Sequence, residues 1–215
     1  MFRYRYYKRK AKNYREFFLS DVIEHPEENS HPARRYSISW ALEHYGEWLR
    51  EYHEGTTWKY PANGISAKDD VFNALYYYAG YGYQHMKPEM NVVISREMQE
   101  PIAKIPDDIV LYRSTYSAQL SERINKGIRK GRVITISGFI STTLIRETIS
   151  ERESNWHEDV LIKIYCSHGT RGLYLDFFSH RDEHEMLLDG NQRFFVLDSK
   201  KKEGKFYIDL ISIPD

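Results

Sequence analysis

Residues 181–188 read Arg181-Asp182-Glu183-His184-Glu185-Met186-Leu187-Leu188, so two glutamates flank one histidine ahead of an apolar run. It has a strand-like composition, and residues two apart on a strand point to the same face. We therefore expect Glu183 and Glu185 to stand side by side, while His184 points away. Two acids on one face are suited to breaking a glycosidic bond, because one steadies an oxocarbenium ion and the other acts on the nucleophile. A solvated edge strand is the plainer alternative, although the apolar residues 186–188 depart from its alternation.

Length and composition indicate a folded domain, alone or with an extension. The chain has 215 residues, with 31 basic and 31 acidic side chains, and is long enough to bury a core. Aromatic residues make up 15%, which argues against a disordered chain. A single cysteine, Cys166, excludes an internal disulfide and a cysteine-based zinc site. The first residues lack the apolar core of a signal peptide, and no apolar run has membrane-spanning length. We therefore expect no membrane contact and a cytoplasmic protein, in the cell that produces it or in a recipient cell.

Residues 1–18 combine basic and aromatic side chains. They hold seven basic residues and seven aromatic ones, with Glu16 as the one acid. Cations attract phosphates and bases stack on rings, so a nucleic-acid contact is one interpretation. The favoured alternative is a helix or arm whose rings pack on the domain while its charges stay in water, because short basic runs are common.

The order of the predicted elements indicates the fold class. Two prolines within residues 25–35 predict a linker, so we divide the chain into an extension with linker, 1–36, and a domain, 37–215. Apolar periodicity predicts helices near 38–52, 66–79 and 90–102, and a further helix through Leu120, Ile124 and Ile128. Strands are predicted at 109–113, 131–143, 160–166, 172–175, 185–188, 194–197 and 206–213. Helices first and strands second predict an α+β fold with a mixed or antiparallel sheet.

Three short motifs with polar or charged side chains follow one another along the predicted strands. Leu111-Tyr112-Arg113 ends a short strand with a guanidinium, residues 138–143 carry adjacent hydroxyls, and Glu183-His184-Glu185 opens an apolar strand. In this order the set resembles the mono-ADP-ribosyltransferases of the arginine–serine–glutamate class, which include bacterial binary-toxin enzymes and small phage-borne transferases. The resemblance covers roughly residues 66–213 of the chain. It implies N-terminal helices packed on the β core of the ADP-ribosyltransferase type, with NAD as substrate.

The resemblance assigns roles to residues whose chemistry fits. A planar guanidinium binds a pyrophosphate with paired hydrogen bonds, the role given to Arg113. Ser141 orients the catalytic carboxylate and lines the ribose pocket. Glu185, held against a ribose hydroxyl, stabilises the oxocarbenium-like state that forms when the nicotinamide–ribose bond breaks. Thr143 replaces the second serine of the family pattern and keeps its hydroxyl. The NAD-binding set is Tyr112, Arg113, Ser141, Thr142, Thr143 and Glu185.

The residues around Glu183 bear on the target. In the resembling families a glutamate at this position accompanies arginine modification, so Glu183 would orient the acceptor guanidinium and take a proton as attack proceeds. Phe177, Phe178 and His180 match the recognition turn. His180 stands where these families often have an aromatic residue, so Phe177 or Phe178 would supply the ring. No metal is expected, because NAD carries its own leaving group.

Three functional alternatives stay open. The first is transfer to an arginine of a target protein. The second is the same chemistry on nucleic acid such as RNA, with a contact through residues 1–18. The third is a non-catalytic binding module with a degenerate transferase fold, against which the retained Arg113, Ser141, Glu183 and Glu185 speak. A phage-injected factor, a secreted effector or the toxin of a toxin–antitoxin pair would each fit, with a delivery partner or an antitoxin as partner.

Overall fold

The computed structural model describes residues 2–24, 36–54, 104–124, 127–149, 157–175 and 183–214. The predicted linker 25–35, the predicted helices 66–79 and 90–102, and the recognition turn with Phe177, Phe178 and His180 lie outside the described residues.

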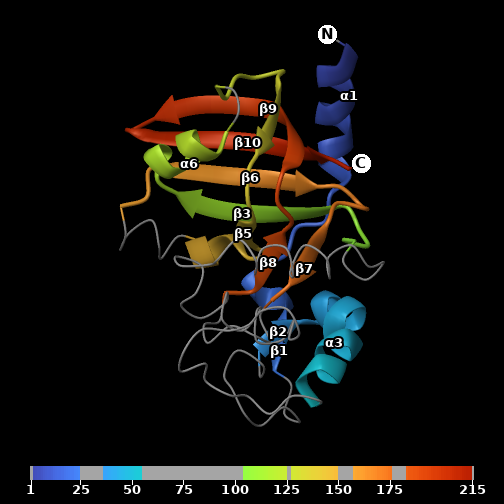
Figure 1. The fold of residues 1–215 in the computed structure, drawn as a ribbon. Helices are drawn as coiled ribbons and strands as arrows, with labels where there is room; N and C mark the ends of the chain where they lie inside the picture. The colour runs from blue at the N-terminus through green and yellow to red at the C-terminus, as the bar shows by residue number, and fades with distance from the viewer. Residues whose placement is uncertain are drawn as a thin grey trace.

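An eight-stranded mixed sheet forms the core of the described chain, in the order β4-β9-β10-β6-β3-β5-β8-β7 (Figure 1). Its strands are β3 (Ile109–Thr115), β4 (Val133–Ile136), β5 (Ile140–Thr143), β6 (Val160–Cys166), β7 (Gly172–Tyr174), β8 (Glu185–Leu188), β9 (Gln192–Lys202) and β10 (Lys205–Ile213). β6 and β10 run parallel, and the other neighbours pair antiparallel. The predicted α+β class with a mixed sheet is confirmed.

The sheet is buried on both faces, and the alternation of its side chains creates two apolar clusters. On β6, Ile162 and Ile164 belong to the larger cluster, whereas Leu161 and Tyr165 pack against the smaller one. The same alternation divides β3, where Leu111 joins the larger cluster and Tyr112 the smaller. This is the period of two expected for strands.

The described helices and short elements surround the sheet. They are α1 (Phe2–Lys10), η1 (Ala11–Asn13), η2 (Leu19–Asp21), β1 (Val22–Glu24), β2 (Tyr36–Ile38), α3 (Ser39–Glu54) and α6 (Ser117–Arg123). The helix predicted near 38–52 is confirmed as α3, whose Trp40, Ala41 and Tyr45 are buried. Trp40 Nε1 also donates to Asp107 at 2.7 Å, which ties α3 to the segment before β3. β1 and β2 form a separate antiparallel ladder beside α3 (Figure 1).

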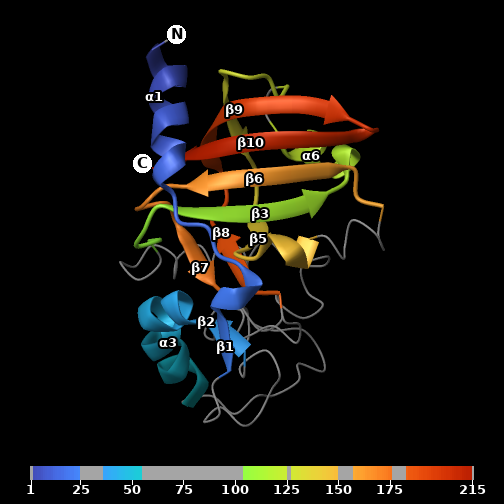
Figure 2. The same cartoon turned by 180° about the vertical axis from the view of Figure 1, so that it is seen from behind.

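Residues 14–17 of the N-terminal segment are part of the folded core. Tyr14 is buried in the smaller cluster and Phe17 in the larger one. Arg15 forms a parallel bridge with Ile109, and Phe17 forms one with Ile145, so the segment runs along the sheet (Figure 2). The prediction that the rings of residues 1–18 pack on the domain is confirmed for Tyr14 and Phe17.

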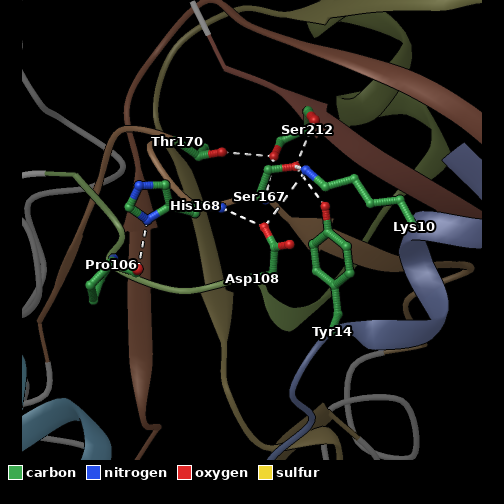
Figure 3. A network of polar contacts seen from close by, with 8 residues as sticks. All are labelled: Lys10, Tyr14, Pro106, Asp108, Ser167, His168, Thr170 and Ser212. Carbon is green, nitrogen blue, oxygen red and sulfur yellow. Dashed lines mark hydrogen bonds and ion pairs between the residues drawn. The ribbon is translucent and has the colours of Figure 1, made fainter.

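A polar network fastens this segment where α1 meets the end of β6 (Figure 3). The Tyr14 hydroxyl lies 2.6 Å from Ser167 Oγ, and Lys10 Nζ donates to the same oxygen at 3.2 Å. Ser167 is held in turn by Ser212, which receives its backbone N–H at 2.7 Å. Lys10 Nζ lies 3.7 Å from Asp108 Oδ1, so α1 is also tied to the residue that precedes β3.

Three predicted elements differ from those observed. The strand predicted over 131–143 is two strands, β4 and β5, because the chain turns at Gly138, whose φ is +68°. The helix predicted through Ile128 ends at Arg123, since Ile124 already forms a β-bridge with Ile136. The strand predicted at 194–197 extends over residues 192–202, because its polar second half pairs with β10 in a long hairpin.

Candidate active site

Three adjacent strands, β3, β5 and β8, bring the three motifs together. Tyr112 pairs with Thr143 between β3 and β5, and Thr143 pairs with Glu185 between β5 and β8. Register partners project to the same face of a sheet, so Thr143 and Glu185 share a face, and Ser141, two residues before Thr143, shares it too. The hydroxyl strand therefore lies between the arginine strand and the glutamate strand.

Arg113 links β3 to the hydroxyl strand. It is half-buried, and its Nη1 donates to the backbone oxygen of Ser141 at 2.7 Å. Its neighbour Tyr112 belongs to the smaller cluster, with Lys163 Nζ 5.5 Å from the centre of its ring. The Arg113 guanidinium thus contacts the backbone of Ser141, while the ring of Tyr112, one residue earlier on β3, projects to the face that the register shares with Thr143.

The two threonines of the hydroxyl strand make local contacts. Thr142 Oγ1 donates to the backbone oxygen of Met186 at 2.6 Å, which locks β5 to β8. Thr143 Oγ1 accepts the N–H of Ile145 at 3.1 Å, so it fixes the turn that leaves β5. Both side chains are buried, whereas Ser141 between Ile140 and Thr142 is half-buried.

The strand begins at Glu185, so the expectation that Glu183 and Glu185 share a strand face is wrong. His184 has a φ of +46°, a left-handed conformation that interrupts the extended chain before the pairing with β5 starts. Its side chain is buried. Glu185 is only 5% exposed, whereas Glu183 is half-buried. The two carboxylates therefore occupy unequal environments, set by one residue in an unusual conformation.

Arg123 supports the start of β5 and was missed by sequence reasoning. Its Nε donates to the Ser137 backbone oxygen at 3.0 Å, and its Nη2 donates to the Phe139 oxygen. The guanidinium thus spans Gly138, next to which Gly190 packs so closely that a Cβ on Gly190 would lie 3.3 Å from the Gly138 carbonyl carbon. Gly138 and Gly190 are the sequence features that mark this turn, but neither glycine indicates that Arg123 contacts it.

An ion pair of Arg171 and Asp189 supports the other end of β8. Arg171 Nη2 lies 2.5 Å from Asp189 Oδ2, and the Asp189 N–H donates to the Arg171 oxygen at 3.0 Å. Gln192 Nε2 donates to that same oxygen at 2.5 Å. These contacts join residues far apart in the chain, so no local pattern could have predicted them. Together with Thr142 they fix the position of the strand that carries Glu185.

Neither an apolar pocket beside α6 nor the buried Cys166 offers a second site for binding a pyrophosphate or for nucleophilic attack. A pocket of about 290 Å³ lies between α6 and the sheet, with lining residues that include Leu120, Ile124 and Ile208 and no charged side chain, so it does not suit a pyrophosphate. Burial raises the pKa of the Cys166 thiol to about 12, so it is not a thiolate nucleophile at neutral pH. Within the described ranges, no group of three or more His, Cys, Asp and Glu residues could hold a metal ion. No helix in the described part of the chain is long and apolar enough to span a membrane.

Comparison with known proteins identifies the fold and family. The sequence profile of the ADP-ribosyltransferase exoenzyme family matches residues 39–211. The chain belongs to this family. The expected resemblance is confirmed, and membership assigns the chain to the transferases that take ADP-ribose from NAD. A search of curated protein sequences gives no match.

Solved structures of bacterial ADP-ribosylating toxins share the fold. Plx2a, an ADP-ribosyltransferase toxin from Paenibacillus larvae, matches with a TM-score of 0.55 and 16% identity, covering 81% of this chain and 93% of that one. The C3 exoenzyme of Clostridium limosum matches with a TM-score of 0.59 and 15% identity, covering 94% and 98%. BECa, from a binary enterotoxin of C. perfringens and solved with NADH, matches with a TM-score of 0.58 and 18% identity, covering 81% and 47%. The chain therefore spans about half the length of BECa.

Proposed function

We propose that this protein is a mono-ADP-ribosyltransferase that transfers ADP-ribose from NAD to an arginine side chain of a target protein. The observation that carries the proposal is the strand order, in which β5 with its hydroxyls lies between β3, which carries Arg113, and β8, which begins at Glu185, with Arg113 bonded to the backbone of Ser141. Family membership supplies the reaction class, and the two glutamates supply the argument for the acceptor.

Arg113 and Ser141 are assigned to binding NAD. The planar guanidinium of Arg113 suits a pyrophosphate, and its bond to the Ser141 backbone holds it beside the hydroxyl strand. The hydroxyl of Ser141 shares a face with Glu185, so it would orient that carboxylate toward the ribose. Thr142, Thr143 and Tyr112 would act mainly by holding β5 between its neighbours, because their side chains make contacts within the protein.

Glu185 is assigned to the bond-breaking step. Its carboxylate is nearly buried on a strand held at both ends, and a carboxylate fixed in a poorly solvated site stabilises a developing cation without having to reorganise. Cleavage of the nicotinamide–ribose bond leaves the electron pair on nicotinamide and the positive charge on the ribose. A carboxylate at Glu185 would favour that charge distribution over the ground state.

Glu183 is assigned to the acceptor. It precedes the strand and is more exposed than Glu185, as a group that meets an incoming side chain would be. The guanidinium forms paired hydrogen bonds with a carboxylate, which would orient it for attack and receive its proton. Vis, an ADP-ribosyltransferase solved with agmatine, matches with a TM-score of 0.50 and 16% identity, covering 80% of this chain and 85% of that one. Agmatine carries a guanidinium, so a guanidinium compound binds a protein of this fold.

The two glutamates give a direct test of the proposal. Glu185→Gln should lower both nicotinamide release from NAD and transfer of label from NAD to protein by at least about a hundredfold. Glu183→Gln should lower transfer while keeping nicotinamide release, because water still captures the cation. Glu203→Gln is the matched control, since Glu203 lies exposed in the β9–β10 turn and should leave both activities unchanged.

The labelled product distinguishes the alternatives. Label that protease removes, and that an arginine analogue competes away, supports an arginine acceptor. Label that nuclease removes would assign the reaction to nucleic acid instead. Equal loss of both activities in the two variants would refute the division of roles. Neither transfer nor nicotinamide release by the wild type would leave a binding module with the transferase fold.

A further inference from the structure

The outward face of α1 is a continuous basic and aromatic surface. Tyr4 and Tyr7 turn inward and pack against the smaller cluster of the sheet. The residues on the opposite side are exposed, namely Phe2, Arg5, Tyr6, Lys8 and Arg9, and so is Lys12 in η1, which follows α1 directly; we include Lys12 in this outward face. Figure 1 shows α1 crossing the ends of β9, β10 and β6, with its N-terminal end extending beyond β9. The outward face is therefore presented to solvent along the whole helix.

The charges on this helix are not arranged to stabilise it. Arg3 and Arg5 lie in the first half of the helix, where no acid is present in the first turn, although the macrodipole favours negative charge there. Arg5 and Arg9 are four residues apart, as are Lys8 and Lys12, and like charges at this spacing repel. A negatively charged partner would relieve both effects, so the arrangement favours an anionic ligand over a solvated face.

The aromatic side chains on this face are large, exposed and partly preorganised. Phe2 is 93% exposed and Tyr6 is 62% exposed. The ring centres of Tyr6 and Tyr7 lie 5.2 Å apart in a T-shaped arrangement, and the ring centre of Tyr7 lies 4.8 Å from that of Phe195 on β9. A ladder of three rings thus leads from the core to the surface and holds Tyr6 in place. Rings fixed between cations form the stacking platform on which successive bases bind.

The helix is also a rigid base for a ligand. The ion pair of Lys10 with Asp108 and the bonds of Lys10 and Tyr14 to Ser167 fasten its C-terminal end to the sheet (Figure 3). Lys130, which pairs with Asp198 at 3.5 Å, lies 5.0 Å from the centre of the Tyr4 ring and so contacts α1 near its other end. The basic surface is therefore preorganised, which lowers the entropy lost when a partner binds.

We propose that the outward face of α1 binds single-stranded nucleic acid, with Arg5, Arg9 and Lys12 contacting phosphates and with Phe2 and Tyr6 stacking on bases. An anionic membrane fits less well, because the helix has already used the inward rings of Tyr4 and Tyr7 against the sheet. Insertion into lipid needs a whole apolar helix face. An acidic protein surface would use the cations but has no need of two stacking rings. The proposal is independent of the proposed transferase activity.

The test measures binding of a fluorescently labelled single-stranded RNA of mixed sequence, about 20 nucleotides long, so that it exceeds one stacking platform. Fluorescence anisotropy of the full chain is recorded at several salt concentrations. Arg5→Gln/Arg9→Gln/Lys12→Gln should weaken binding at least about tenfold and reduce the steepness of the salt dependence by about 2, since each phosphate contact contributes roughly 0.7. Phe2→Ala/Tyr6→Ala should weaken binding about tenfold with the salt dependence unchanged.

The matched control removes three positive charges from a surface away from α1. Lys200→Gln/Lys201→Gln/Lys202→Gln acts near the β9–β10 turn, at the end of these strands away from α1 (Figure 2). It should change the affinity less than about threefold, and circular dichroism should show that every variant is folded. Equal losses in both triple variants, or full binding by the ring variant, would overturn the proposal. So would an absence of RNA binding together with binding to phosphatidylserine vesicles, which would assign the surface to membranes.

Discussion

At the scale of single residues, the half-buried carboxylate of Asp209 has a consequence for stability. Burial raises its pKa, and the carboxylate of Asp198 opposite it on β9 raises it further, while Lys163 and Lys200 oppose the shift. A raised pKa in the folded state means that ionisation at neutral pH destabilises the fold. Asp209→Asn should therefore stabilise the protein at pH 7 by about 1 kcal/mol or less. Urea unfolding should show this gain shrinking as the pH falls through the folded pKa.

The pKa of Asp159 is shifted in the opposite direction to that of Asp209, which makes Asp159 a matched comparison. Its carboxylate accepts the N–H of Ser117 at 2.7 Å, at the start of α6, and this hydrogen bonding lowers its pKa. The ionised Asp159 carboxylate therefore stabilises the fold at pH values above the pKa that it has in the unfolded chain. This stabilisation is lost as the pH falls through the pKa that it has in the folded protein. Asp159→Asn should therefore destabilise the protein at pH 7. A change in the free energy of unfolding in the same direction for Asp209→Asn and Asp159→Asn would contradict the opposite pKa shifts of the two aspartates.

At the scale of elements, the segment of residues 14–17 behaves as part of the core. Phe17 is 1% exposed and packs on Trp40 with ring centres 5.3 Å apart, whereas Phe18 beside it is 50% exposed. Phe17→Ala should lower the free energy of unfolding by about 3–5 kcal/mol, as expected for a buried ring. Phe18→Ala should lower it by well under about 1 kcal/mol. Chemical unfolding of the two variants measures the difference. A small effect of Phe17→Ala would mean that the domain folds without its N-terminal segment, as a boundary at residue 36 implies.

The elements that could be predicted are those whose pattern is local. The β8 strand at 185–188, the β6 strand at 160–166 and the α3 helix follow their apolar periodicity, because one or two faces of each must be buried. The break at Gly138 was not predicted, because the apolar residues on both sides of it, Ile136 and Ile140, are buried in the same cluster and hide the turn.

The site was predictable to the same extent. Motif order selected Arg113, Ser141 and Glu185 as candidates, and the strands that carry them are neighbours. The position of Glu183 was not predicted, because the left-handed conformation of His184 interrupts a stretch whose composition is strand-like and leaves no mark in that pattern. Arg123, Arg171 and Asp189 act through contacts across the sheet, which sequence patterns do not record.

At the scale of the whole molecule, the charge is balanced in total but separated in space. The chain has no formal net charge, yet residues 1–18 carry seven basic residues against one acid, so the rest of the chain has a net negative charge. Charges farther apart than a Debye length, about 10 Å at 0.1 M salt, act on a partner independently. The basic face of α1 therefore retains a local positive potential although the protein as a whole is neutral.

This separation predicts how the protein binds a charged resin. At a pH near its calculated isoelectric point of about 7.1, the protein should be retained on a cation exchanger, because the surface of α1 can face the resin while the acidic remainder faces away. Arg5→Gln/Arg9→Gln/Lys12→Gln should elute at clearly lower salt than Lys200→Gln/Lys201→Gln/Lys202→Gln, although both variants lose the same charge. Elution of the two variants at the same salt concentration would show that retention follows net charge and that α1 presents no separate basic surface. The comparison needs no ligand, so it tests the electrostatic part of the α1 proposal by itself.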